Sequence, residues 1–338
     1  MSAPRLCRGA GVGSDPQPML LYLLRRLVWA AVVILAVTAV TFAIFYLLPP
    51  GDPAARFAGR SPTPELIATV RHNLGLDQPW YSQYFKFVKN IVTGDEYGWP
   101  GLGYSYGSSV PIRDKIIEKA PRTLSLIGGA AVLWLLMGIS IGVLSAVKRR
   151  SFFDRLAMGF ALFGISAPVF WLGLMALFLF WYKLDITAGT GYVALTDSPS
   201  QWFSHLILPW TVLALLYAAT YARMVRGSLL DTLGEDYIRT ARAKGLTERR
   251  VIFGHGLRAS LAPIVTMFGL DTALLVGGAV ITESVFNLDG LGFMAIDSVF
   301  RGDLPATLGV VLIGTFAVVM MNLLVDVAYA FLDPRVRY

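Results

Sequence analysis

Long apolar stretches without charged side chains dominate the chain. Six of them occupy residues 27–51, 123–147, 156–182, 198–222, 259–282 and 304–325, and only Asp271 interrupts one. About 20 apolar residues are enough to carry an α-helix across the hydrocarbon core. Because backbone groups must be paired internally in lipid, each stretch predicts a transmembrane helix. The pattern predicts an all-α polytopic membrane protein with six spans.

The first stretch has a competing interpretation as a signal peptide, because Arg25 and Arg26 precede it. Its 25 charge-free residues exceed the apolar region of a signal peptide, so a first transmembrane helix over 23–50 is favoured. Residues 1–22 are expected to be a disordered cytoplasmic lead. Residues 51–121 then form a small extracytoplasmic helical domain, and 122–338 form a permease core of five helices.

Basic residues fall unevenly on the connections between these stretches. Eighteen of the 29 Lys and Arg residues lie in the N-terminal lead, the 148–155 connection, segment 223–258 and the C-terminal tail. The two short connections on the opposite side hold only Lys183 and Arg301. Short cytoplasmic loops are enriched in Lys and Arg, so both termini are expected in the cytoplasm of a bacterial inner-membrane protein. Topology therefore explains most of the net charge of +7, and no nucleic-acid partner is implied.

The 51–121 domain carries helix signals of its own. Thr63 can cap a helix that begins at Pro64, and Gly75 can end it. A second helix would place an apolar stripe on one side, made of Trp80, Tyr81, Tyr84, Phe85, Val88, Ile91 and Val92. These helices either pack as an external cap or lie in the membrane interface.

Segment 223–258 carries the most informative pattern. Tyr237, Ile238 and Ala241 share one helical face, and Gly245 follows at a position where a positive φ is often needed. Charged residues flank that face. The segment therefore predicts a short, projecting amphipathic helix whose apolar face fits a groove on a soluble partner.

The stretch Glu235–Leu246 (EDYIRTARAKGL) resembles the ATPase-coupling loop, or EAA loop, of ATP-binding-cassette importer permeases. Further motifs resemble the dipeptide and oligopeptide group, including LPPGDP at 48–53, LGLDQP at 74–79, GAVITE at 278–283 and LDPRVRY at 332–338. Arg239, Thr240 and Ala241 depart from the Glu-Ala-Ala that opens the general pattern. Residues 96–101 are an insertion relative to many members.

The resemblance implies a type I importer permease fold and a set of partners. A second homologous permease would complete the pore, two ATPase subunits would dock on the coupling loop, and an extracytoplasmic solute-binding protein would deliver peptide. ATP and Mg would bind only on the ATPase subunits, and no cofactor is expected on this chain. The sequence contains no Gly-Lys dipeptide and hence no P-loop, so this chain is not expected to be an enzyme. The implied coupling residues are Glu235, Asp236, Tyr237, Ile238, Arg239, Thr240, Ala241, Lys244, Gly245 and Leu246.

Three residues inside the spans are candidates for the substrate path. Asp271 is a carboxyl in mid-span, and such a group is a functional hypothesis by default. A structural bond to a hydroxyl such as that of Thr266 or Thr272, or to the partner permease, is the alternative. Ser166 and Pro168 mark a kink in the third span, which either lines the path or is purely structural.

The remaining polar residues favour no other chemistry. Glu283 and Asp326 are expected in interfacial roles at helix ends, and Asp326 as a cap or salt-bridge partner. The three histidines are scattered, so no metal site is predicted.

Other function classes fit the pattern less well. A nickel chelate or an oligosaccharide is the alternative cargo of the same importer class. An ion-coupled secondary transporter would need more intramembrane ionisable groups than Asp271, and an intramembrane enzyme would need a catalytic constellation that the spans lack.

Overall fold

A computed structural model of the chain describes residues 19–48, 51–59, 62–276 and 278–332. The predicted disordered lead, apart from its last residues, and the 333–338 part of the C-terminal motif lie outside the described residues. The regular secondary structure of these described residues is helical apart from one short hairpin. Its elements are α1 (Met19–Phe42), the π-helical η1 (Ala43–Leu47), α2 (Pro53–Phe57), α3 (Pro64–Leu74), α4 (Trp80–Thr93), β1 (Tyr104–Ser105), β2 (Val110–Pro111), α5 (Ile112–Val147), α6 (Phe152–Ser166), α7 (Val169–Ala176), η2 (Leu177–Lys183), α8 (Pro199–Leu233), α9 (Asp236–Ala243), α10 (Glu248–Arg250), η3 (Val251–Leu257), α11 (Arg258–Ser260), α12 (Ala262–Val276), α13 (Val280–Val285), α14 (Leu291–Arg301) and α15 (Leu304–Leu332).

Six membrane crossings are available among the described residues. Four are continuous helical stretches, Leu24–Leu47, Ile112–Val147, Pro199–Leu233 and Leu304–Val327. The other two are bent pairs, Phe152–Gly164 with Val169–Lys183 and Glu248–Ser260 with Ala262–Val276. Counting each pair as one span gives the number that the apolar stretches predict.

The third span differs from its prediction as a single kinked helix. Its two parts meet at 102°. Ala167 and Pro168 are both extended, with ψ of 129° and 131°, so α6 ends and α7 restarts instead of continuing through a bend. Proline lacks the N–H that a continuing helix needs, and it disfavours helical geometry in the residue before it.

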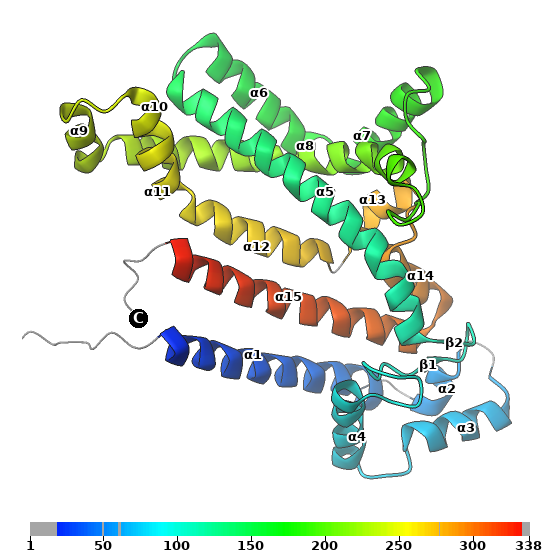
Figure 1. Cartoon of the computed structure of the whole chain (residues 1–338). Helices are drawn as coiled ribbons and strands as arrows, with labels where there is room; N and C mark the ends of the chain where they lie inside the picture. The colour runs from blue at the N-terminus through cyan, green and yellow to red at the C-terminus, as the bar shows by residue number, and fades with distance from the viewer. Residues whose placement is uncertain (1–18, 49–50, 60–61, 277, 333–338) are drawn as a thin grey trace, which may run out of the picture.

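The helices pack around α5 and α8, while α12, α15 and α1 lie in a row beside them (Figure 1). Trp134 on α5 and Tyr221 on α8 are fully buried in this core. Small residues permit the close approach of the two helices: a Cβ on Gly142 would lie 2.6 Å from the Cβ of Val225. Gly269 on α12 likewise faces Val325 on α15, where a Cβ would approach the valine Cγ2 to 1.8 Å.

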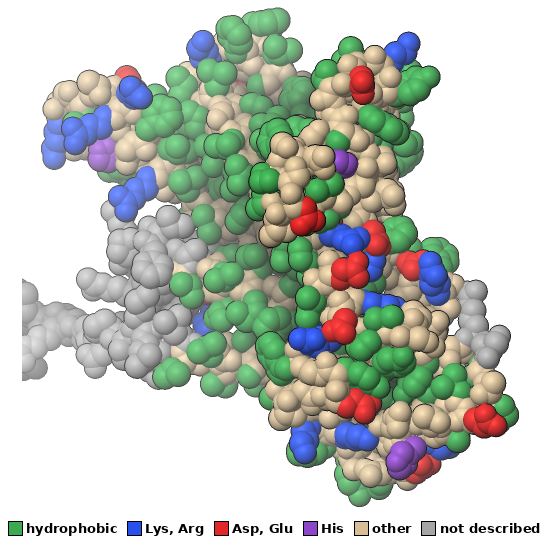
Figure 2. All heavy atoms as spheres, turned by 45° about the vertical axis from the view of Figure 1, so that its right-hand side comes forward, with side chains coloured by type: hydrophobic (Ala, Val, Ile, Leu, Met, Phe, Trp, Pro, Cys, Tyr) green, Lys and Arg blue, Asp and Glu red, His purple; other side chains and the backbone are tan. Residues whose placement is uncertain are grey.

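The two ends of the bundle carry different structures. The small elements α2, α3, α4 and the β1–β2 hairpin lie at one end, and α9 and α10 lie at the other (Figure 1). The first turn of α1 and the last turn of α15 lie at the α9 end. Charged side chains gather toward these ends, with apolar side chains between them (Figure 2). Near the α9 end Asp326 pairs with Arg26 at 2.9 Å, which confirms the salt bridge predicted for Asp326.

The helix signals in the 51–121 segment are confirmed in detail. The Thr63 hydroxyl accepts the N–H of Leu66 at 3.3 Å, and Gly75 ends α3 with a φ of 68°. Two features were not predicted: the two-residue strands, which pair antiparallel, and the start of α5 at Ile112, inside that segment. The first turns of α5 are polar and extend beyond the apolar stretch.

Candidate coupling segment and membrane path

Helix α9 has a defined start and a defined end. Glu235 is extended just before it, and Gly245 follows it with a φ of 78°. The Gly245 N–H donates to the Arg242 carbonyl at 2.9 Å, and the Leu246 N–H donates to the Ala241 carbonyl at 3.3 Å. This pair of bonds is a Schellman motif, which requires the positive φ predicted for Gly245.

The apolar face of α9 points into the chain itself, not toward a partner. Ile238 and Ala241 are buried against Val251, with Leu233 and Leu246 packed around them. The prediction that this face fits a partner's groove is therefore wrong in its orientation. A helix of eight residues cannot bury an apolar face alone, and segment 246–251 folds back to cover it.

The opposite face of α9 is open. Asp236, Arg239, Thr240 and Ala243 are exposed there, and Lys244 follows at the helix end. Tyr237, at the side, is 47% exposed. Arg242 donates to Glu248 at 2.8 Å and so ties α9 to α10. The surface left for a partner is polar with small residues at its centre.

Asp271 is tied to a neighbouring helix. The Tyr221 hydroxyl on α8 donates to the Asp271 carboxylate at 2.9 Å. The predicted bond to a hydroxyl is present, but the donor is this tyrosine and not Thr266 or Thr272, since Thr266 donates to the Ala262 carbonyl on its own helix. Asp271 therefore joins α12 to α8.

Ser166 and Pro168 lie on a different span from Asp271, which is on α12. They occupy the break between α6 and α7 and are exposed. Their role in a path stays a prediction.

A buried ion pair that the sequence analysis missed lies where α5, α6 and α8 meet. Asp154 accepts two bonds from Arg226, at 2.8 and 2.9 Å, and also accepts from the Ser145 hydroxyl and the Arg150 N–H. The side chain of Asp154 is only 7% exposed. The sequence signal was Ser151, whose hydroxyl accepts the Asp154 N–H at the start of α6, three residues before an acidic residue.

Removal of Arg226 should strongly destabilise this junction. Arg226→Met would leave a buried carboxylate without its cation, which costs about 3 to 5 kcal/mol. We expect a clear drop in the melting temperature of the purified protein in lipid nanodiscs. The double variant Asp154→Asn with Arg226→Met should recover most of the loss, because no unpaired charge is left. A single variant as stable as the wild type would show that the pair contributes nothing.

A second buried carboxyl fixes the short helices α13 and α14, which connect α12 to α15. Glu283 on α13 is fully buried, so the prediction of an interfacial role is wrong. Its carboxylate accepts the Thr123 hydroxyl at 2.7 Å and the Phe293 N–H at 2.8 Å. Burial raises the pKa of the Glu283 carboxyl above its ordinary value, and these two bonds oppose that rise only in part. The group joins α5, α13 and α14.

Charged residues reinforce that junction nearby. Asp289 pairs with Lys119 and with Arg122, the latter at 2.9 Å, and both cations are on α5. Thr123 accepts the Leu291 N–H at 2.8 Å. The connection from α13 to α14 is therefore fastened to the first half of α5.

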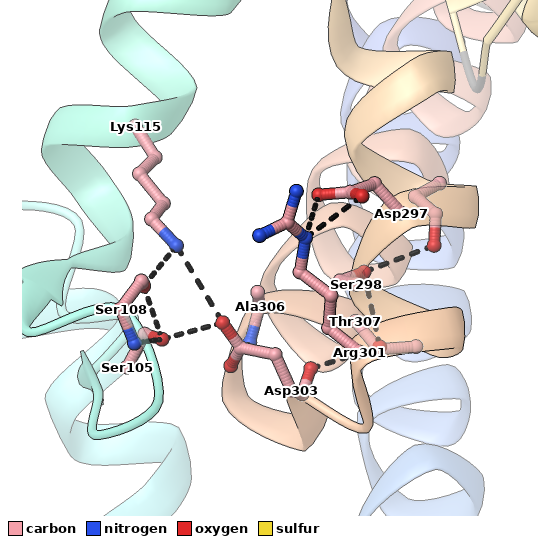
Figure 3. Close-up of polar contacts among 10 residues, drawn as sticks. Ser105, Ser108, Lys115, Asp297, Ser298, Arg301, Asp303, Ala306 and Thr307 are labelled. Carbon is pink, nitrogen blue, oxygen red and sulfur yellow. Dashed lines mark hydrogen bonds and ion pairs between the residues drawn. The ribbon is translucent and has the colours of Figure 1, made fainter. Parts of the chain in front are cut away.

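A further polar cluster joins the hairpin to the start of α15 (Figure 3). Ser105 donates to Asp303 at 2.5 Å, Lys115 approaches the same carboxylate at 3.5 Å, and Ser108 contacts both Ser105 and Lys115. Asp303 also accepts the Ala306 N–H, and so caps α15. Within the adjacent α14, Arg301 pairs with Asp297 one turn before it. No group of three or more possible metal ligands is present in the described part of the chain.

Comparison with known proteins places the chain in a family. The family model "Binding-protein-dependent transport system inner membrane component" matches residues 138–338, and the model "Binding-prot-dependent transport system membrane comp, N-term" matches 19–127. A peptide transport system permease protein of Brucella abortus (strain 2308) is 40% identical, over 94% of this chain and 98% of its own length. The dipeptide transport system permease protein DppB of Escherichia coli (strain K12) is 39% identical, over 95% of this chain and 99% of its own length.

A solved structure shares the fold. An inward-facing form of the MetNI methionine ABC transporter aligns with a TM-score of 0.53, covering 66% of this chain and 98% of that chain. The sequences are 18% identical over the alignment, so this likeness concerns the fold alone.

Proposed function

The chain belongs to the family of binding-protein-dependent transport system inner membrane components, and on that premise we propose that it is the transmembrane permease subunit of an ATP-driven importer of dipeptides and oligopeptides. The names of its relatives from Brucella abortus and Escherichia coli support the peptide cargo. The α9 unit supports the coupling to an ATPase, because it is a helix packed on its own small core that projects at one end of the bundle and has an open polar face.

We place four partners around this chain. A second homologous permease completes the translocation path, and two ATPase subunits bind ATP and Mg and dock on residues 235–246. A solute-binding protein delivers peptide at the end that carries α2, α3 and α4. The α9 end and both termini then face the cytoplasm of a bacterium. Eighteen of the 29 basic residues lie on the lead, the tail and the connections at that end, which supports this orientation.

The internal packing of α9 suggests how force is transmitted. Ile238 and Ala241 fasten α9 to Leu233 at the end of α8 and to Val251 on η3. A push on the open face of α9 therefore moves α8 and the segment leading into α12 as one body. Asp271 and Tyr221 join those two helices again within the bundle. In this scheme Asp271 is a structural link, and Ser166 with Pro168 forms a hinge candidate beside the path.

Solute uptake tests the cargo. The chain would be assembled with its second permease, ATPase and binding-protein partners in liposomes, and uptake of a labelled dipeptide would be measured against excess unlabelled competitors. We expect competition by di- and oligopeptides and none by a nickel chelate or an oligosaccharide. If only the nickel chelate or only the oligosaccharide competed, the assignment as an importer subunit would stand, and that solute would be assigned as the cargo in place of peptides. An ion-coupled secondary transporter is the least favoured alternative, since it does not account for the projecting α9.

A further inference from the structure

Helix α4 has a polar face that is already occupied by the chain. Lys86 donates to the Asn73 carbonyl at 2.8 Å, and Gln83 donates to the Gln78 carbonyl at 2.7 Å. Both acceptors belong to the end of α3 and the turn after it. This face of α4 is thus fastened to the small domain.

A second face fixes α4 to the first spanning helix. The Tyr84 hydroxyl donates to the Leu35 carbonyl at 3.1 Å and lies 3.2 Å from the Thr38 hydroxyl. The ring of Phe42 contacts both Tyr84 and Phe87, with centroids 5.4 and 5.8 Å apart. In Figure 1, α4 crosses α1 at a steep angle instead of running along it.

The third face of α4 is open and mainly apolar, and the exposed Lys89 lies on it between Phe85 and Val92. Tyr81, Phe85 and Val92, spaced four and seven residues apart, are 62%, 71% and 65% exposed. Two tryptophans lie at its ends: Trp80 begins the helix, and the exposed Trp99 donates to the Val92 carbonyl at 3.1 Å. Amphipathic aromatic rings of this kind concentrate at the boundary between hydrocarbon and headgroups.

The contact with α1 sets the depth of this face. The spanning stretch of α1 and η1 runs from Leu24 to Leu47, so Thr38 lies inside it, roughly 13 Å before its end at 1.5 Å per residue. On the same face of α1 as this contact, three and seven residues before Leu35, the side chains of Val32 and Val28 are 47% and 63% exposed, and Leu35 itself is 50% exposed. Helix α4 therefore lies against an apolar face of α1 that this chain leaves open to lipid where α1 crosses the bilayer.

We infer that α4 is an interfacial helix, whose face formed by Tyr81, Phe85, Val88 and Val92 is embedded in the lipid leaflet on the α2–α4 side of the membrane. The occupant is phospholipid, with acyl chains against Phe85 and headgroups near Trp80 and Trp99. An amphipathic helix lying in the interface plane has this distribution of apolar and polar side chains. The inference requires only that α1 spans the bilayer, and it is independent of peptide transport.

Depth-dependent quenching tests the inference. In a Cys7→Ser background, which removes the sole native cysteine, Phe85→Cys would carry a bimane probe. The matched control is Ala68→Cys on the exposed surface of α3. The full complex would be reconstituted in vesicles of phosphatidylethanolamine and phosphatidylglycerol. One set of vesicles would contain a 5-doxyl lipid as the membrane quencher. A second set, without that lipid, would be exposed to iodide as the aqueous quencher.

The probe at residue 85 should be quenched by the doxyl lipid at least twofold more strongly than the probe at residue 68, and iodide should show the reverse order. Equal iodide quenching at both positions, without a doxyl effect, would mean that the face is in water. Protection from both quenchers would mean that another protein chain covers it. Either of these two results would overturn the inference.

Discussion

An Ala243→Trp variant is expected to fold and insert normally, yet to dock its ATPase partner more weakly and to lose peptide-stimulated ATP hydrolysis and uptake by roughly tenfold or more. Ala243 lies on the open face of α9, opposite the buried Ile238 and Ala241. A bulky ring in a well-packed contact costs about 1 to 3 kcal/mol, and each 1.4 kcal/mol is a factor of ten in affinity. Because the side chain points away from the chain's own core, the stability of the subunit should not change.

The control is Arg149→Trp, which adds the same ring at an exposed position on the connection between α5 and α6. This variant should retain stimulated hydrolysis. Ala241→Trp, in contrast, would enter the small core of the segment and test its folding rather than its contact with a partner. If Ala243→Trp coupled ATP hydrolysis to peptide as well as the wild type, the open face of α9 would not be the docking surface.

Removal of the Glu283 carboxyl should cost more stability than removal of any exposed carboxyl on the same end of the molecule. In Glu283→Ala the Thr123 hydroxyl and the Phe293 N–H lose their acceptor in a buried site, and a cavity is left. We expect a loss of about 2 to 4 kcal/mol in the free energy of unfolding. Glu118→Ala, which breaks only an exposed pair with Arg122, should cost less than about 1 kcal/mol.

The raised pKa of Glu283 gives this prediction a pH dependence. The folded protein holds the proton more tightly than the unfolded chain, so the stability contributed by protonation is present at low pH and is lost as pH rises through the raised value. The melting temperature of the wild type relative to Glu283→Gln should therefore fall with rising pH. A difference that is constant with pH would show that the carboxyl has its ordinary pKa, and equal stability of Glu283→Ala and Glu118→Ala would refute the anchoring role.

The spans and many helix ends could be predicted because they follow from local physical rules. A charge-free apolar stretch has few alternatives to a membrane helix, and Thr63, Gly75 and Gly245 act through their own backbone geometry. The break at Ala167 and Pro168 was predicted as a position but not as a turn of 102°. The angle depends on which helices α7 packs against, and the residues around the break do not determine those contacts.

The coupling segment could be predicted from the sequence, but the direction in which its apolar face points could not. The pattern at 237–241 identifies an apolar face, but only the fold shows that Val251 and Leu246 cover it. The partners of Asp154 and Glu283 lie 72 and 160 residues away in the sequence, in Arg226 and Thr123. Tertiary pairs at such separations leave no periodic signal in a single sequence, so an acidic residue at a helix end was interpreted as interfacial.

The most direct test of the account is whether ATP alone drives transport. The complete complex would be reconstituted in liposomes with ATP and Mg trapped inside, the binding protein outside and no ion gradient, and accumulation of a labelled dipeptide would be followed over time. The account predicts accumulation that stops when the trapped ATP is replaced by a non-hydrolysable analogue. Equal accumulation with the non-hydrolysable analogue, or accumulation that appears only when an ion gradient is imposed on the same liposomes, would contradict it.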